Sequence, residues 1–394
     1  MVVLERDVRA VGGSVRHAGH LFFSALPVGG ALDTAELARE RWLELTRKAG
    51  AFVTEAGTLI VARHADELAV MEGAAAERED RARMLTAAQA RDMAPIAGSG
   101  VVGGFHGARD LRVDPRAVTA ALARVLTRDL RARLEWGAHV HEVEQGVVHT
   151  DQLRVRAQAI VVCPGVDDRT LPPALFAGGG HRALCRSQML RLAAPTGRRY
   201  RPAIATGLTL LRHPAFAVQP GAGQLRARLE LEKPELVERS AQLLVAQLPD
   251  GDLIIGDTKA YENVPVPFAT ERGFRLLLEE AESLLGIRPE VRQRWLGTEA
   301  SPGAGDPGAD FRVTAPIPGV RLVLSVSPLA MALCHVKASE VLGELLLEGS
   351  HSQIGGAAFP ENAAVPDFVL ADRRPVATGV RAHPEAFRAR PVRV

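Results

Sequence analysis

Apolar residues in the first part of the chain recur at spacings that switch between helical and extended structure. Residues 34–49 carry apolar positions at helical spacing, with Asp33 or Thr34 available as a cap and Gly50 at the position of a C′ glycine. The run 58–62 is β-branched and apolar, which favours a buried strand. These patterns predict a helix followed by a strand.

Two further helices are indicated by amphipathic spacing and by capping residues. Residues 66–79 carry apolar positions along one helical face. Farther along, Asp114 precedes Pro115, so that an acidic cap is followed by a proline at the first helical position. We expect that helix to run to about residue 126.

Short alternating segments follow in quick succession from residue 134 to residue 163. Glycine and polar residues separate them, which is typical of hairpin strands. The pattern predicts a three-stranded meander followed by a return strand, over 140–143, 147–150, 153–155 and 159–163.

The middle of the chain changes character and predicts an antiparallel lobe. Strands are expected at 188–192, 243–248 and 253–257, and the last two flank the turn sequence Pro249-Asp250-Gly251. The helix expected over 274–285 has one apolar face, so it should cover one side of this sheet.

The last ordered elements return the chain to the first lobe. A β-branched run over 320–326 predicts a strand, and 337–347 has the pattern of a helix. Beyond residue 349 the composition turns to Ala, Pro, Gly and Arg with little periodicity, which is typical of a surface-hugging or disordered tail. Two lobes that interleave in sequence are therefore expected.

Composition narrows the class of function. The 394 residues carry 48 basic and 46 acidic side chains, a balance that gives no electrostatic footprint for nucleic acid or an anionic membrane. We see no apolar run near the roughly 20 residues that cross a bilayer and no charged-then-apolar leader. A cytoplasmic protein acting on a small molecule is expected, with its oligomeric state left open.

The cysteines suggest neither a disulfide framework nor a metal site. Cys163, Cys185 and Cys334 are three in number, widely separated and without CxxC spacing. We expect buried thiols and no bound metal.

The residues that carry a resemblance stand at the start of the chain. The string 2–6, Val-Val-Leu-Glu-Arg, precedes Gly12-Gly13-Ser14-Val15-Arg16-His17-Ala18-Gly19. Together they resemble the second strand and following loop of the FAD-dependent glycine and D-amino-acid oxidase (DAO) superfamily. The segments 184–191, 207–213 and 256–257 follow in the order seen in a bacterial branch associated with aminophosphonate breakdown, so the resemblance spans residues 2–348.

The resemblance implies an α/β fold in which a Rossmann-like FAD-binding domain is interleaved with an antiparallel-sheet substrate domain. The implied FAD-binding domain comprises 1–35, 110–180 and 318–349, the implied substrate domain 36–109 and 181–317, and the tail 350–394. Glu5, at the end of its strand, stands where an acid accepts the ribose hydroxyls of the adenosine. The implied cofactor-binding residues are Glu5, Arg6, Gly12, Gly13, Ser14, Arg16, Val140, Pro164, Gly165 and Met331.

The same resemblance implies oxidation of a small amine or amino acid, with an aminophosphonate as one candidate. Enzymes of this kind remove a hydride from the carbon that bears the amine, and water hydrolyses the resulting imine. The protein supplies orientation, including a cation for an anionic group of the substrate. Arg16, His213 and Lys259 are the candidates, and each has an alternative, purely structural role.

Two departures from the family pattern bear on the cofactor. Such proteins carry about 30 residues ahead of the position of Val2, with a strand, a G-x-G-x-x-G turn and a helix that holds the pyrophosphate. We expect these to be missing, which would expose two neighbouring strand edges. In addition, the glycine-rich turn expected near the C-terminus reads Ser-Val-Ser-Pro-Leu-Ala-Met-Ala over 325–332, and Pro328 lacks an N–H donor.

These departures leave other functions open. A degenerate homologue that binds little flavin could act as a non-catalytic binding or scaffold protein. A nicotinamide-dependent reductase would also place Glu5 on a ribose, but it needs a glycine loop between a strand and the helix that the loop opens. We expect no G-x-G-x-x-G motif anywhere in this chain.

Overall fold

The structure is a computed structural model that describes residues 1–166, 171–176, 184–193, 196–262, 266, 268–300 and 309–352. Its helices are α1 (Gly30–Ala49), α2 (Ala65–Ala76), α3 (Ala87–Met93), α4 (Pro115–Arg128), α5 (Pro214–Ala217), α6 (Ala222–Glu232), α7 (Pro234–Glu238), α8 (Glu271–Leu285) and α9 (Ala330–Ser352), with 3-10 helices η1 (Gly13–Val15), η2 (Phe23–Ala25), η3 (Glu79–Arg81), η4 (Pro173–Phe176) and η5 (Gly207–Leu211). The tail expected over 350–394 lies outside the described residues from residue 353 onward.

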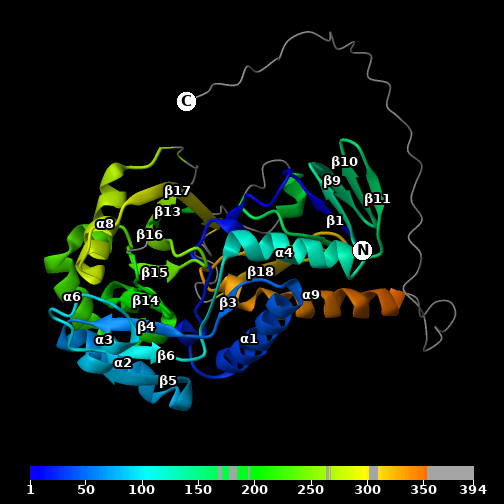
Figure 1. The fold of residues 1–394 in the computed structure, drawn as a ribbon. Coiled ribbons are helices and arrows are strands. Elements are labelled where there is room, and N and C mark those ends of the chain that lie inside the picture. Colours follow the sequence, from blue (N-terminus) through cyan, green and yellow to red (C-terminus); the bar gives the residue numbers. More distant parts are fainter. Residues whose placement is uncertain are drawn as a thin grey trace, which may run out of the picture.

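The strands fall into separate sheets that belong to two lobes (Figure 1). They are β1 (Val2–Glu5), β2 (His20–Leu21), β3 (Val53–Thr54), β4 (Thr58–Ala62), β5 (Ala82–Thr86), β6 (Gly103–Gly107), β7 (Leu111–Val113), β8 (Arg133–Trp136), β9 (Val140–Glu144), β10 (Val147–Thr150), β11 (Arg154–Arg156), β12 (Ile160–Val162), β13 (Leu184–Leu192), β14 (Ala203–Thr206), β15 (Leu244–Gln247), β16 (Leu253–Glu262), β17 (Val291–Ala300), β18 (Phe311–Thr314) and β19 (Val320–Ser325).

The larger lobe is built on a mixed sheet with the strand order β17-β13-β16-β15-β14-β4-β6-β5. Neighbouring strands are antiparallel except β14 and β4, which are parallel. The apolar face of α8 packs on one side of this sheet, where Leu277 and Leu284 join Leu190 and Ile255 in one buried cluster. The expected hairpin around residues 249–251 and the covering helix are both confirmed.

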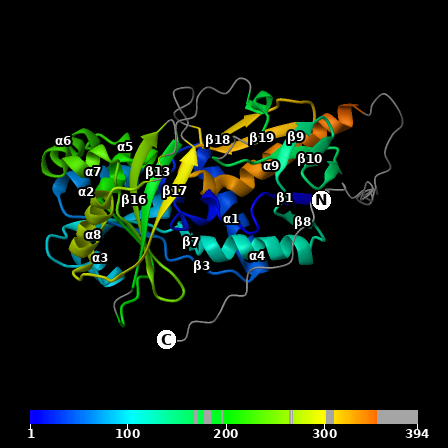
Figure 2. The same cartoon turned by 90° about the horizontal axis from the view of Figure 1, so that it is seen from above.

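The smaller lobe holds the N-terminal strand and the last helix (Figure 2). β1 pairs in parallel with β8, and β12 pairs in parallel with β19, whose other neighbour is β18. β9, β10 and β11 form the expected antiparallel meander. Leu4, Val140 and Val162, from three of these strands, pack around the same small core.

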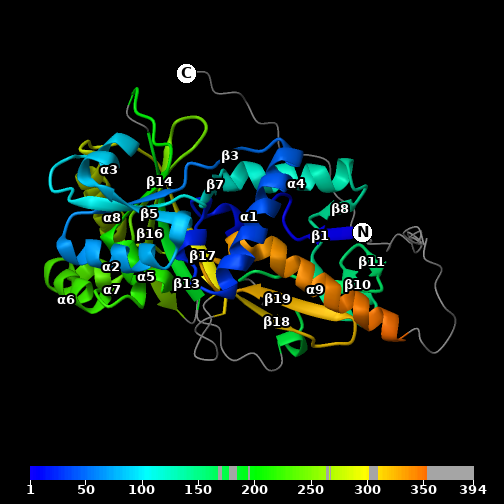
Figure 3. The ribbon, with the colours of Figure 1, turned by 90° about the horizontal axis from the view of Figure 1, so that it is seen from below.

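Helix α1 packs against α4 and α9 (Figure 3). A helix from the N-terminal part of the chain therefore contacts the last described helix. The indole Nε1 of Trp42 donates to the carbonyl oxygen of Ala332 at 3.1 Å, and the Trp42 ring meets His335 edge-on at 4.5 Å. The boundary expected at residue 36 thus falls within α1, and the division into domains stays a prediction.

Local signals located the helix ends well, with two corrections. Asp114 accepts hydrogen bonds from the amides of Arg116 and Ala117 ahead of α4, and Gly50 and Gly286 close α1 and α8 in the left-handed conformation that glycine tolerates. However, α1 begins at Gly30, so neither Asp33 nor Thr34 caps it. Helix α9 begins at Ala330 rather than 337, because Ala332 and Leu333 extend its buried face.

The G-x-G-x-x-G spacing does occur, contrary to the sequence expectation, and the occurrence that the structure describes has no context that suits a dinucleotide. Gly98, Gly100 and Gly103 have it, and they lie in the connection between α3 and β6, which opens no helix. Gly303, Gly305 and Gly308 repeat it outside the described residues.

Among the helices that the structure describes, none is long and apolar enough to cross a bilayer.

A buried carboxylate ties η2 to the loop between β6 and β7. Asp110 has no exposed surface and accepts hydrogen bonds from the amide and hydroxyl of Ser24, at 2.7 Å and 2.5 Å. Burial raises the pKa of Asp110 to about 6, although these hydrogen bonds oppose the rise. Because the folded-state pKa is raised, the carboxyl favours folding below its unfolded pKa, and this contribution is lost as the pH rises through about 6.

We therefore expect Asp110→Asn, which keeps an acceptor for Ser24, to change the pH dependence of stability. Relative to the parent chain, the variant should gain about 2.4 kcal/mol of unfolding free energy between pH 4 and pH 7, because the unfolded carboxyl is already partly ionised at pH 4. Urea unfolding at both pH values measures this, with Asp92→Asn on the exposed side of α3 as the control. If the stability difference between variant and parent is the same at both pH values, Asp110 titrates normally in the fold.

Candidate functional site

The loop after β1 lies against the edge strand of the large sheet. Glu5 ends β1, and its Oε1 accepts a hydrogen bond from the amide of Asp7 at 2.9 Å. Farther along, the carbonyl oxygen of Arg16 accepts a hydrogen bond from Trp295 Nε1 on β17 at 2.8 Å. A Cβ on Gly13 would lie 3.3 Å from the carbonyl oxygen of Thr298, so this loop approaches β17 closely.

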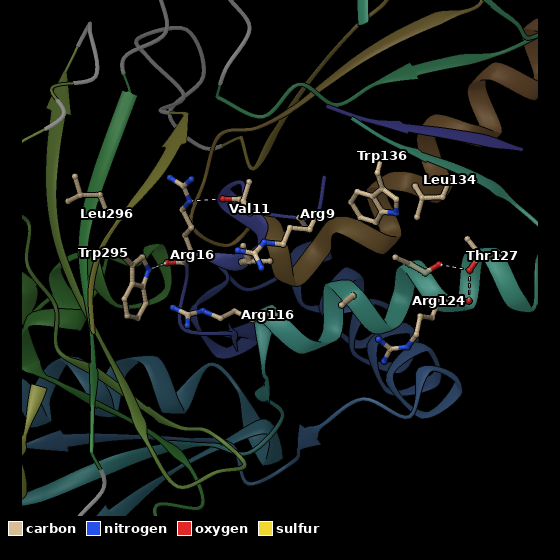
Figure 4. Close-up of a pocket in the computed structure, with 14 residues that line it drawn as sticks. Arg9, Val11, Arg16, Arg116, Arg124, Thr127, Leu134, Trp136, Trp295 and Leu296 are labelled. Carbon is tan, nitrogen blue, oxygen red and sulfur yellow. Dashed lines mark hydrogen bonds between the residues drawn. The ribbon is translucent and has the colours of Figure 1, made fainter. Parts of the chain in front are cut away.

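A groove with a volume of about 960 Å³ opens between this loop, α4, β8 and β17 (Figure 4). We call it the α4 groove. It is lined by Arg9, Ala10, Val11, Val15, Arg16, Arg116, Ala120, Ala123, Arg124, Thr127, Leu134, Trp136, Trp295 and Leu296. Its lining holds arginine side chains and no carboxylate, so it favours an anionic ligand.

The two ends of the α4 groove carry different tryptophans. Trp295 lies under the guanidinium of Arg116, whose carbon is 4.9 Å from the ring centroid. Trp136, at the other end, keeps 42% of its surface exposed. It pairs in register with Glu5 across the parallel strands β1 and β8, so both side chains point to the same side of that sheet.

Four charged side chains gather on β16, on β17 and just after η5, and we call them the buried charge cluster. Lys259 forms an ion pair with Glu299, and Arg212 forms a two-armed ion pair with Asp257, one arm measuring 3.1 Å. The Lys259 side chain is 4% exposed, whereas Glu299 keeps 31% of its surface. Solvent or a ligand therefore reaches the Lys259 ammonium from the side on which Glu299 lies.

Arg212 keeps the Asp257 carboxylate ionised despite its burial. Burial alone would raise the pKa of Asp257, but the charge and hydrogen bonds of Arg212 outweigh it and hold that pKa below its usual value. Burial instead dominates at the neighbouring Cys185, whose thiol pKa it raises to about 12. Cys185 is thus a neutral thiol at physiological pH, not a nucleophile.

Neutral histidines border the cluster. Burial lowers the pKa of His17 to about 4, of His20 to about 3 and of His213 to about 3, with the charge of Arg212 adding to the shift at His213. His213 Nε2 lies 3.2 Å from Gln242 Oε1, and its Nδ1 is buried with no partner in the described part of the chain. Donation through Nε2 leaves Nδ1 as an open acceptor.

The three candidates for orienting a substrate are thus placed differently. Lys259 and His213 are close enough for the lysine charge to lower the histidine pKa, so the fold brings them together. Being neutral, His213 offers a hydrogen bond rather than a charge. Arg16 is exposed, and its Nε donates to the carbonyl oxygen of Val11 at 2.7 Å, which turns its side chain toward the α4 groove.

The candidate cofactor residues lie around the ends of several strands. Gly12, Gly13 and Ser14 are exposed in the loop after β1, and Arg6 is exposed directly after Glu5. Val140 packs on the same small core as β1, which ends at Glu5, and β12, which ends at Val162 shortly before Pro164-Gly165. Met331, in the first turn of α9, packs instead on the main hydrophobic core, to which α1, α9 and the large sheet all contribute.

These residues fit a flavin dinucleotide in their chemistry. The α4 groove has the volume of a cofactor site, guanidiniums suit a diphosphate, and tryptophan rings suit a flat aromatic ring. Cβ atoms on Gly12 and Gly165 would meet nothing within 4 Å, so open space lies beside both. Trp295 and Glu299 occupy one face of β17 about 14 Å apart, which links the α4 groove to the buried charge cluster.

Sequence reasoning missed several of these residues. Arg212 and Glu299 pair with partners 45 and 40 residues away, and no local pattern marks such pairs. The arginines of the groove are likewise inconspicuous among the many arginines of this chain. Only the rarity of tryptophan could have drawn attention to Trp136 and Trp295, because the chain holds three tryptophans in total.

Comparison with known proteins identifies the family of this chain. Residues 1–338 match the model of the DAO family, described as FAD dependent oxidoreductase. A search of curated protein sequences finds no match to this chain.

Solved structures share the fold at low sequence identity. A glycine oxidase from Geobacillus kaustophilus superposes with a TM-score of 0.67 at 16% identity, covering 91% of this chain and 89% of that one. A glycine oxidase from Bacillus cereus gives 0.68 at 14% identity, covering 88% and 91%. An L-α-glycerophosphate oxidase from Mycoplasma pneumoniae with FAD bound gives 0.63 at 14% identity, covering 89% and 88%.

Proposed function

This chain belongs to the DAO family of FAD-dependent oxidoreductases, and from that premise we propose that it oxidises the carbon–nitrogen bond of a small amine or amino acid that bears an anionic group. An aminophosphonate is one candidate substrate. The similar glycine oxidase structures support an amine as the substrate. The similar glycerophosphate oxidase is named for a substrate that is anionic but is not an amine, so it supports only the anionic group. The buried charge cluster is the observation that carries the proposal.

Lys259 is the group that we assign to the substrate's anionic group. Its ammonium is almost fully buried, and its partner Glu299 is the more exposed member of the pair. A carboxylate or phosphonate that approaches from the side of Glu299 can take the place of the Glu299 carboxylate, which is exposed enough to return to water, so that the ammonium stays paired. Arg212 is less available, because both arms of its guanidinium already hold Asp257.

Neutral hydrogen-bonding groups next to the cluster suit the amine. His213 Nδ1 is a buried acceptor without a partner in the described part of the chain, and a substrate amine is a donor. The low pKa of His213 keeps this acceptor unprotonated across the physiological range. Lys259 and His213 can therefore hold the two polar ends of one small substrate and fix the carbon between them.

FAD, when bound, supplies the two-electron acceptor for the hydride that leaves this carbon, after which water hydrolyses the imine. We assign Glu5 as the acceptor for the ribose hydroxyls of FAD. We assign the loop of Gly12, Gly13, Ser14 and Arg16 to further contacts with FAD. Arg6, Val140, Pro164, Gly165 and Met331 stay predicted contacts. Closing this loop on β17 keeps water from the reacting carbon.

The first experiment is the visible absorption spectrum of the purified protein with and without added FAD. We expect flavin absorption that is bleached without oxygen by an amino acid or aminophosphonate, but not by the matched hydroxy acid. Bleaching by the hydroxy acid alone would shift the assignment to carbon–oxygen oxidation. A protein that stays colourless after FAD addition would contradict the proposal and favour a non-catalytic binding protein.

A further inference from the structure

Two of the arginines that line the α4 groove have no role in the proposed substrate site. Arg9 and Arg124 line it, and neither side chain makes a hydrogen bond or ion pair within the described part of the chain. Both are exposed, whereas most charged side chains near the buried charge cluster are paired. A concave surface with free guanidiniums and no carboxylate concentrates positive potential.

We propose that Arg9 and Arg124 hold the diphosphate of the dinucleotide cofactor in the α4 groove. Guanidiniums bind phosphate oxygens through paired, charge-assisted hydrogen bonds. The inference rests on the proposed function only for the identity of the cofactor.

The positions of the two arginines suit a ligand that spans the groove. Arg9 follows β1 in the loop that leads to Gly12, and Arg124 lies on α4, toward the end where Trp136 and Leu134 are found (Figure 4). Glu5 faces the same side as Trp136, so the groove begins beside the acid assigned to the ribose. It ends at Trp295, on the strand that leads to Lys259 through Glu299.

The other two lining arginines are less available to a phosphate. Arg16 Nε is bound to the carbonyl oxygen of Val11, and Arg116 donates to Gln293 Oε1 at 3.0 Å while it lies over Trp295. They add positive potential without needing to leave their partners. Arg9 and Arg124 lose no interaction of this kind when they bind a ligand, which favours them as its contacts.

The test compares two flavins that differ in the diphosphate and in the adenosine attached to it. Riboflavin lacks phosphate, and FAD carries the diphosphate and the adenosine. Binding of each to Arg9→Gln/Arg124→Gln is measured by quenching of tryptophan fluorescence, with Arg83→Gln, an exposed position on β5 in the other lobe, as the control. We expect FAD affinity to fall roughly 100-fold, about tenfold for each arginine, with riboflavin affinity unchanged.

Each result decides between the alternatives. Selective loss of FAD affinity, with Arg83→Gln unaffected, supports the inference. Equal losses for FAD and riboflavin would mean that the arginines only shape the groove, and an unchanged FAD affinity would place the diphosphate elsewhere; either result overturns the inference. If the parent chain binds FAD through these arginines but oxidises no amine, the proposed substrate fails while the inference stands.

Discussion

Replacing Lys259 by methionine is expected to lower kcat/KM for the anionic amine substrate by about 100-fold or more. The ammonium is the buried cation assigned to the substrate's anionic group, and methionine keeps its length without its charge. For an uncharged amine of similar size, kcat/KM should change little. Steady-state kinetics on the two substrates measure the ratio.

The Lys259 prediction needs a control, because the substitution also leaves Glu299 without its partner. The double variant Lys259→Met/Glu299→Gln removes both charges, so it should recover most of any lost stability without recovering activity. If the double variant regains kcat/KM for the anionic substrate, Lys259 serves only to neutralise Glu299. An unchanged substrate ratio in Lys259→Met would likewise reject the assignment.

Arg78→Met is expected to lower the free energy of unfolding by about 3–5 kcal/mol. Arg78 is 1% exposed and follows α2, and its guanidinium donates to the carbonyl oxygens of Ser24, Leu26 and Ala74 at 3.2, 2.8 and 2.7 Å. Methionine fills much of the same volume but leaves these buried acceptors without donors. Denaturant unfolding measures the loss.

The loss at Arg78 should also affect the site, because two of its acceptors, Ser24 and Leu26, belong to or adjoin η2. Phe22, just before η2, meets His213 edge-on with ring centroids 5.0 Å apart. Arg81→Met, at a partly exposed arginine on the neighbouring η3, is the matched control and should cost less than about 1 kcal/mol. Equal effects of the two substitutions would show that Arg78 is not the residue that fixes η2.

Sequence reasoning succeeded where the signal is local. Asp114-Pro115 marked the start of α4, and Gly50 and Gly286 marked the ends of α1 and α8, because caps depend on residues within one turn. The hairpin around residues 249–251 has the same local origin. Secondary structure was therefore largely predictable.

The candidate site was less predictable, because distant segments build it. Neither the pairing of β13 with both β16 and β17 nor the partnership of Lys259 with Glu299 follows from any spacing in the sequence. Protonation states depend on the fold as well, since His213 loses its charge only through burial and the nearby Arg212. Family resemblance supplied the cofactor, whereas the arginines of the groove come together only in the folded chain.

The contact between Trp42 and Ala332 has a consequence during synthesis. The two residues are 290 positions apart, and a ribosome that adds 5–20 residues per second needs roughly 15–60 s to make that stretch. Throughout that time the apolar face of α1 has no α9 to cover it. We therefore expect nascent chains of this protein to depend on chaperones that shield that face until translation reaches the last helix.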